Sequence, residues 1–143
     1  MSVLRVAANV QSSSESITKA FPPSQTAHMD RHVLWNNNNF ECNILNVDGS
    51  CLGTPPRACF GGLIRNSDGY YIYGFSGFLP ASTDILQAEL SAIYFGLRST
   101  KDLGISPLAC YSDSILAIDT IIEACSTYHV YAVLIHEIKV LLA

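Results

Sequence analysis

The chain has 143 residues, of which 49% are hydrophobic and 14% are charged, and its formal net charge at pH 7 is −4. This length is enough for one domain with a buried core, and the composition excludes disorder throughout the chain. The negative charge argues against a strongly basic surface for nucleic acid, and no apolar run reaches the roughly 18 residues of a membrane-spanning helix.

Cysteine usage indicates the redox environment. There are 5 cysteines, an odd number, and none form a C-x-x-C pair. Cys59, Cys110 and Cys125 lie inside apolar segments, where cysteine usually packs as a small hydrophobic residue. We expect a reducing compartment and no disulfide partner, although no motif indicates nucleus, cytoplasm or organelle.

Residues 1–40 are predicted to be a disordered N-terminal tail that precedes a domain over residues 41–143. The tail contains QSSSES, FPPSQ and NNNNF without sustained periodicity. His28 and His32 stand four residues apart with Asp30 between them. We interpret them as solvated side chains rather than as a metal site.

Three consecutive strands are predicted at the start of the domain. In residues 44–48 (ILNVD), Leu45 and Val47 lie on one face and Asp48 on the other, as a period of two requires. The runs ACFGGLIR and YYIYGFSGFL follow. Because the turn NSDG joins them, they are predicted to form a β-hairpin.

A long helix is predicted over residues 82–104, where apolar residues recur at helical spacing. Thr83 or Asp84 can cap its start, with Gln87 placed three residues after Asp84 as in a capping box. Gly104 marks its end.

A fourth strand and two more helices complete the order. They are predicted over residues 107–113 (PLACYSD), 114–125 (SILAIDTIIEAC) and 130–143. The order β-β-β-α-β-α-α predicts an α/β fold with a mixed β-sheet flanked by helices.

Three carboxylates occupy unusual positions in this scheme. Asp48 ends a strand of buried character, where an unpaired charge costs several kcal/mol, although Asp-Gly-Ser is also a turn signal. Glu89 lies within the apolar stripe of the long helix, where it either faces the core or reaches out to water. Asp113 ends the fourth strand, where it can instead cap the next helix.

The three positions can converge. If the fourth strand pairs in parallel with the first through a right-handed crossover, Asp48 and Asp113 lie at the same carboxyl end of adjacent strands. The crossover helix covers the same face, so Glu89 can point toward them. Acids without a basic partner raise one another's pKa values, and Mg²⁺ removes that conflict. We therefore interpret Asp48, Glu89 and Asp113 as metal ligands.

From about residue 35 onward, the segments D-G-S, GG-x-x-R, a hairpin with GFSG, QAEL and S-D-S occur in this order. Together they resemble the ribonuclease H fold, and most closely the plant reverse-transcriptase-like ribonuclease H type-1 domains. The resemblance covers roughly three quarters of the chain.

This resemblance implies metal-dependent endonucleolytic cleavage of the RNA strand of RNA–DNA hybrids. Four acids around two Mg²⁺ ions do this in relatives, and three carry over, as catalytic candidates and ligands, to Asp48, Glu89 and Asp113. Mn²⁺ is expected to substitute for Mg²⁺. The backbone of Gly49 and Ser50 is expected to approach the nucleic acid.

The chain also departs from that pattern. In relatives a final strand and helix follow and supply the fourth acid, but here the sequence reaches Ala143 where that strand would begin. We expect an incomplete domain with one ligand missing and one sheet edge open. Three readings therefore remain: an active ribonuclease, a ribonuclease H-like binding or interaction module that no longer cuts, and a truncated retroelement-derived remnant. The oligomeric state is left open.

Overall fold

The computed structural model describes residues 3–4, 41–80, 82–123 and 129–143. Five strands form one sheet in the order β1-β5-β2-β3-β4. The strands are β1 (Val3–Leu4), β2 (Asn43–Leu52), β3 (Arg57–Arg65), β4 (Tyr71–Leu79) and β5 (Leu108–Tyr111). The helices are α2 (Ile85–Asp102), α3 (Ile115–Ile122) and α4 (Ala132–Leu142).

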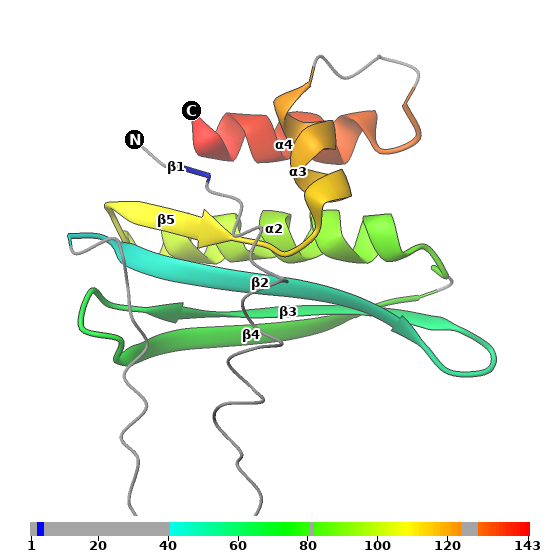
Figure 1. Ribbon diagram of the computed structural model, residues 1–143, viewed down its shortest axis with the longest axis horizontal. Helices are drawn as coiled ribbons and strands as arrows, with labels where there is room; N and C mark the ends of the chain where they lie inside the picture. Colours follow the sequence, from blue (N-terminus) through cyan, green and yellow to red (C-terminus); the bar gives the residue numbers. More distant parts are fainter. Residues whose placement is uncertain (1–2, 5–40, 81, 124–128) are drawn as a thin grey trace, which may run out of the picture.

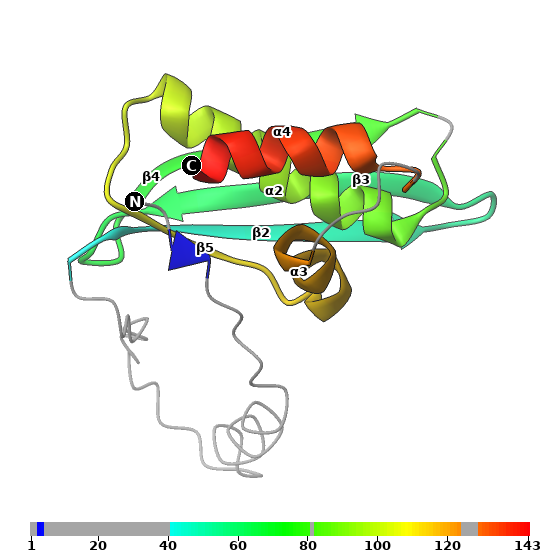
Figure 2. The same cartoon turned by 90° about the horizontal axis from the view of Figure 1, so that it is seen from above.

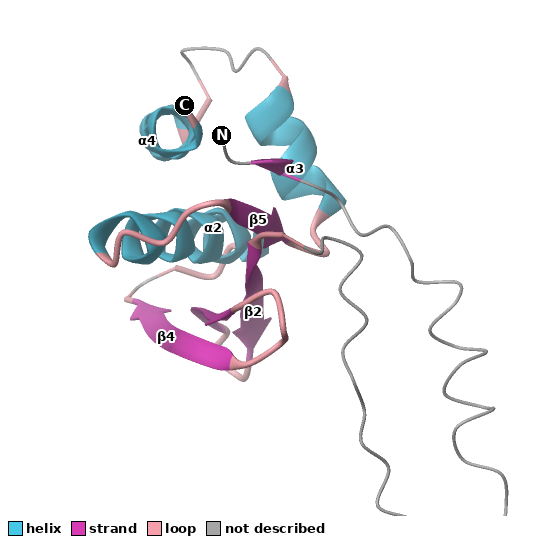
Figure 3. Cartoon of the chain, turned by 90° about the vertical axis from the view of Figure 1, so that its left-hand side faces the viewer, coloured by secondary structure: helices cyan, strands magenta, loops and turns pink. Residues whose placement is uncertain are grey.

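The helices lie on one side of the sheet, as Figure 1 shows. Helix α2 contacts β2 and β3, and α4 lies on the outer side of α2. Figure 3 gives the same layering end-on, with sheet, α2 and α4 in succession. The mixed α/β architecture and the order of the seven elements from β2 onward confirm the prediction.

The first predicted strand is longer than expected. We expected Asp48 to end it, but β2 continues to Leu52. Over this extension β2 pairs antiparallel with β3, up to Leu52 and Arg57, whereas its parallel pairing with β5 stops at Asn46 and Tyr111. Asp48 therefore lies inside a strand, but beyond the point where that strand loses its neighbour on one side.

The sheet edge next to β5 is occupied, in contrast to the open edge expected from the sequence. β1 pairs with β5 in parallel, with Val3 opposite Ala109 and Leu4 opposite Cys110. Figure 2 shows this short strand beside β5. Val3–Leu4 is the described part of the predicted tail. The rest of that tail, with His28 and His32, lies outside the described residues.

The core lies between the sheet and α2, with α4 closing its outer side. Large side chains from the sheet, including Leu45 and Ile64, are fully buried against Leu90 and Ile93 of α2 and Ile138 of α4. Burial of each such side chain stabilises the fold by about 1.5–3 kcal/mol. This layer determines where α2, and therefore Glu89, sits over β2.

Two glycines permit unusually close packing of α2 on β2. A Cβ atom on Gly49 would lie 2.5 Å from the backbone nitrogen of Glu89 and 2.7 Å from the carbonyl carbon of Ala88. A Cβ atom on Gly96 would lie 2.8 Å from a methyl group of Leu45. The helix thus rests directly on the strand backbone at Gly49, next to Asp48.

Helices α2 and α3 both begin with a side-chain cap. Asp84 accepts a hydrogen bond from the Leu86 N–H at the start of α2, so Asp84 rather than Thr83 is the cap. The expected capping box is not formed, because Gln87 instead accepts a hydrogen bond from the Ser82 hydroxyl. Ser114 caps α3 and accepts from the Ala117 N–H.

The described part of the chain contains neither a helix that could span a membrane nor a disulfide. None of its helices combines the length and apolarity required to cross a bilayer. No disulfide joins Cys42, Cys51, Cys59 and Cys110, and Cys125 lies outside the described residues.

Candidate metal centre

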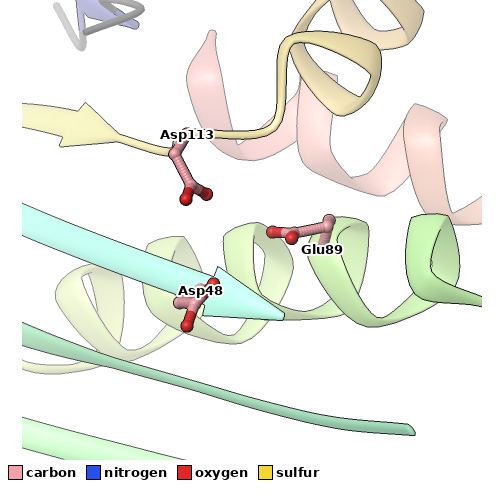
Figure 4. Close-up of side chains that lie close together, drawn as sticks. All are labelled: Asp48, Glu89 and Asp113. Atoms are coloured by element: carbon pink, nitrogen blue, oxygen red, sulfur yellow. The ribbon is translucent and has the colours of Figure 1, made fainter. Parts of the chain in front are cut away.

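Three carboxylates from three separate elements meet at one end of the sheet. Asp48 comes from β2, Glu89 from α2, and Asp113 from the loop between β5 and α3. One oxygen of each lies within 4.8 Å of the others. Figure 4 shows the three side chains turned toward a common space.

Strand register brings Asp48 and Asp113 together. The last parallel pair between β2 and β5 is Asn46 with Tyr111, and two further residues along each chain lead to Asp48 and Asp113. The two acids are therefore level, at the carboxyl ends of neighbouring parallel segments, where open α/β sheets place their sites. The predicted parallel pairing of these strands is confirmed.

Glu89 is the buried member of the group, with 7% of its surface exposed. Its carboxylate oxygen Oε2 accepts a hydrogen bond of 3.1 Å from the backbone N–H of Gly49. Burial first, and then the charges of Asp113 and Asp48, raise the pKa of Glu89 from 4.5 to about 7. The Gly49 N–H works in the opposite direction but does not offset these effects.

Asp113 is exposed and does not cap the following helix. That role belongs to Ser114, whose own N–H donates to the hydroxyl of buried Ser112. The two serines flanking Asp113 thus satisfy the backbone at the helix start. The Asp113 carboxylate remains available to the group, and the helix-capping alternative considered from the sequence is excluded.

Asp48 borders two shallow pockets, which also share Asn46 and Val47. One pocket, of about 180 Å³, extends toward Tyr111, Ser112 and Asp113. The other, of about 420 Å³, extends over β2 and β3 and reaches Ser50 and Cys59. Asp48 stands between them, so a ligand lying in either pocket is within reach of its carboxylate.

This donor set fits a hard divalent cation. Within the described residues, none of the three acids forms a salt bridge; the ion pair present there joins Arg98 to Asp102. Three convergent carboxylates without a cation repel one another, and after burial this repulsion is the next cause of the raised pKa of Glu89. Carboxylate oxygens are preferred by Mg²⁺, Mn²⁺ and Ca²⁺, and not by thiophilic metals.

Gly49 has a role that the sequence reasoning missed. Its N–H donates to Glu89, and its missing side chain allows α2 to approach. A glycine inside a strand is a signal of such close approach. Gly49 is buried and Ser50 is half-buried at the pocket edge. Contact of these two residues with nucleic acid remains a prediction.

A family profile described as "Reverse transcriptase-like" matches residues 46–142. No curated protein sequence matches the chain.

The chain is similar to solved structures of ribonucleases H, of which three are described here. Ribonuclease H1 from the halophilic archaeon Halobacterium salinarum is 23% identical, with 70% of this chain and 76% of that chain covered, at a TM-score of 0.61. The N-terminal ribonuclease H domain of a Mycobacterium tuberculosis protein is 21% identical, covering 69% of this chain and 72% of that chain, at 0.59. LC11-RNase H1, which was isolated from compost, has been solved in complex with an RNA/DNA hybrid. It is 21% identical, with 68% of this chain and 76% of that chain covered, at a TM-score of 0.56. At these identities the likeness establishes the fold.

Proposed function

The chain belongs to the reverse transcriptase-like family and has a ribonuclease H-like fold, and on this premise we propose that it binds nucleic acid and cleaves the RNA strand of RNA–DNA hybrids with the help of Mg²⁺. The observation that carries the proposal is the convergence of Asp48, Glu89 and Asp113 within 4.8 Å. Mn²⁺ has the same preference for oxygen ligands and is expected to replace Mg²⁺.

The three acids have different environments and therefore different tasks. Asp48 and Asp113 are exposed, so they can hold a cation and also face a phosphate group of the substrate. Glu89 is buried and oriented by the Gly49 N–H, so it forms the rigid side of the site. A bound divalent cation would neutralise these charges and supply Lewis-acid activation for phosphoryl transfer.

The choice of substrate is supported by two similar structures, and the charge of the chain makes a bound cation necessary for it. The LC11 enzyme and a foamy-virus protease–reverse transcriptase have both been solved with RNA/DNA hybrid, the latter being 16% identical at a TM-score of 0.61. A chain with a net charge of −4 repels a phosphate backbone. The cation at the acid group is therefore expected to contribute to substrate binding as well as to chemistry.

A second candidate is a binding or interaction module that no longer cuts. The group of carboxylates in the described residues has three members, whereas the resemblance noted above implies four. The negative net charge also favours this alternative. It predicts hybrid binding, or none, without cleavage.

The deciding experiment is cleavage of an end-labelled RNA–DNA hybrid by the full chain, with Mg²⁺, with Mn²⁺ and with EDTA. Removing a residue that only orients a metal ligand typically costs about 10–100-fold in metal affinity or activity, so Asp113→Asn, which changes a proposed ligand itself, should reduce cleavage at least that much. Asp102→Asn is the matched control. It makes the same chemical change at the far end of α2, where it loses only the exposed ion pair with Arg98.

Metal-dependent products that disappear in Asp113→Asn and persist in Asp102→Asn would establish the nuclease. Equal cleavage by both variants would point to a contaminating enzyme. A folded chain that binds hybrid in a gel-shift assay but yields no product would leave the non-cutting module.

A further inference from the structure

Asn46 lies on β2 two residues before Asp48, and it borders both pockets of the site. Because strand side chains alternate between the two faces of a sheet, Asn46 and Asp48 share a face, about 6–7 Å apart along the strand. Asn46 and Tyr111 form the last pair of the parallel ladder, so Asn46 stands where β2 and β5 begin to separate. The smaller pocket, which reaches Asp113, begins at this point.

Arg65 fixes the orientation of the Asn46 amide. It lies on β3 opposite Ile44, and its guanidinium Nη2 donates a hydrogen bond of 2.6 Å to Oδ1 of Asn46. A guanidinium group has five donors and no acceptor, so the amide must present its oxygen to Arg65. The NH₂ group of Asn46 is therefore turned away from Arg65. Hydrogen bonds from a charged donor are shorter and stronger than neutral ones, which holds this orientation.

The NH₂ group of Asn46 is available to a ligand. In the part of the chain that the structure describes, it donates to no protein acceptor, and the bond from Arg65 is the one that this side chain makes. The charge of Arg65 also polarises the amide and strengthens its donor end. Beside three acids, the site thus offers one oriented donor with a positive charge behind it, which suits an anionic oxygen.

We propose that Asn46, positioned by Arg65, binds a phosphate oxygen of the nucleic acid beside the acid group. The inference rests on the proposed function, because it concerns the substrate of the same site. A cation at the acids attracts the phosphate backbone, and Asn46 donates to a further oxygen of that backbone. Arg65 acts through Asn46 and does not need to touch the substrate.

A neutral amide suits this position better than a basic side chain does. A lysine or arginine two residues from Asp48 on the same face would pair with that carboxylate and compete with the cation. An amide donates to an anion without occupying the acids. Contacts to phosphate oxygens fix the register of a protein on nucleic acid but read no bases. The Asn46 contact should therefore strengthen binding equally for hybrids of different sequence.

The test is the dissociation constant of a labelled RNA–DNA hybrid, measured by fluorescence anisotropy with the full chain in Ca²⁺, which takes the same oxygen ligands as Mg²⁺. Hydrogen bonds to charged groups are among the stronger ones, so Asn46→Ala should weaken binding by about 10–100-fold. Asn43→Ala is the matched control. It removes an amide from the same strand, where the amide donates to the Pro107 carbonyl, and should bind like wild type.

Two further measurements separate substrate binding from a structural role. Asn46→Asp keeps an oxygen for Arg65, and with it the fold, but it has no donor and adds a negative charge. It should melt like wild type and bind hybrid at least as weakly as Asn46→Ala. The melting shift caused by Mg²⁺ should persist in Asn46→Ala, because Asn46 is not among the three acids of the cation site.

Modified hybrids locate the contact. A methylphosphonate linkage replaces one charged phosphate oxygen by a methyl group, and such linkages are placed one at a time along each strand. At the linkage that Asn46 contacts, wild type should lose affinity, whereas Asn46→Ala should lose no more than it has already lost. A side chain that only supports Arg65 produces no coupling confined to one linkage.

The outcomes distinguish this inference from the proposed function. A folded wild type that binds no hybrid would overturn both. Wild type that binds, with Asn46→Ala or Asn46→Asp binding equally tightly, would overturn the inference and leave the proposed function standing. Loss of the Mg²⁺ shift in Asn46→Ala would assign Asn46 to the cation instead of the substrate. Equal sensitivity of wild type and Asn46→Ala to every methylphosphonate would exclude the phosphate contact.

Discussion

The two halves of the sheet differ in strand direction and in the kind of side chain that they expose. The parallel half, β2 with β5, is covered by α2 and gathers charged side chains at its carboxyl end. The antiparallel half, β3 with β4, is a hairpin whose outer strand exposes aromatic and aliphatic side chains. In the first half the apolar side chains of Ile44, Leu45 and Val47 on β2 and of Leu108 to Cys110 on β5 are buried, and Asp48 and Asp113 are exposed beside them. In the second, exposure of apolar surface is the exception.

The acid group is a site that depends on tertiary packing, whereas the exposed side chains of β4 form a surface on a single strand. The acid group exists because three distant segments are packed against one another, so small changes there should disturb both stability and chemistry. The exposed edge of β4 is a local feature of one strand, so single changes there should leave the folded chain intact. The predictions below test that division, beginning with the largest expected effect.

Gly49→Ala should be the most damaging small substitution in the parallel half. The added Cβ meets the backbone of α2 at 2.5 Å, and backbone cannot move as a flexible side chain does. We expect a loss of about 3 kcal/mol or more in the free energy of unfolding, measured with urea. Gly61→Ala, in the antiparallel half, has its nearest contact at 3.1 Å and should cost clearly less. Equal costs would remove the distinction between the halves.

Glu89→Gln should stabilise the metal-free protein in a pH-dependent way. The folded state holds the Glu89 proton up to about pH 7, compared with 4.5 for an ordinary glutamate, so wild-type stability falls as pH rises through this window. Glutamine keeps an acceptor for the Gly49 N–H and does not ionise. The advantage of the variant over wild type should grow from near zero at about pH 4 to about 3 kcal/mol at about pH 8.

Urea unfolding of both proteins in EDTA across this pH range measures the difference. If the difference in free energy of unfolding between the variant and wild type did not change with pH, the pKa of Glu89 would not be raised in the folded chain. Asp102→Asn, which removes an exposed carboxylate, should show no such growth.

Mg²⁺ should stabilise the folded chain through the acid group. A ligand present at about ten times its dissociation constant adds about 1.4 kcal/mol, which thermal melting detects as a shift of several degrees. Asp48→Asn and Asp113→Asn should each abolish most of this shift, whereas Asp102→Asn should retain it. A shift that persists in both site variants would place the cation elsewhere.

Ile72→Lys should have the smallest effect on the fold itself. The side chain is 41% exposed on the open edge, so the free energy of unfolding at low micromolar concentration should stay within about 0.5 kcal/mol of wild type. Urea unfolding again provides the measurement. A large destabilisation would show that β4 depends on contacts beyond those described.

Much of the site could be read from local sequence. Helical spacing placed Glu89 on the core-facing stripe of α2, and its burial confirms that position. The S-D-S segment was recognised at the end of a strand, but the choice between Asp113 and Ser114 as helix cap needed the backbone hydrogen bonds. The expected end of the first strand was wrong, because the pairing of β2 with β3 continues past Asp48.

The sequence alone determined the order of the elements, the alternation of Leu45 and Val47 into the core, and the three acids as candidates, because these depend on periods of two and 3.6 residues within single segments. Tertiary structure alone decided the rest. The register that levels Asp48 with Asp113 joins strands far apart in the chain, and the bond from Gly49 to Glu89 spans 40 residues. β1 at the β5 edge is likewise a long-range pairing. Such contacts depend on which surfaces pack together when the chain folds, and the hydrophobic periodicity of a single segment does not contain this information.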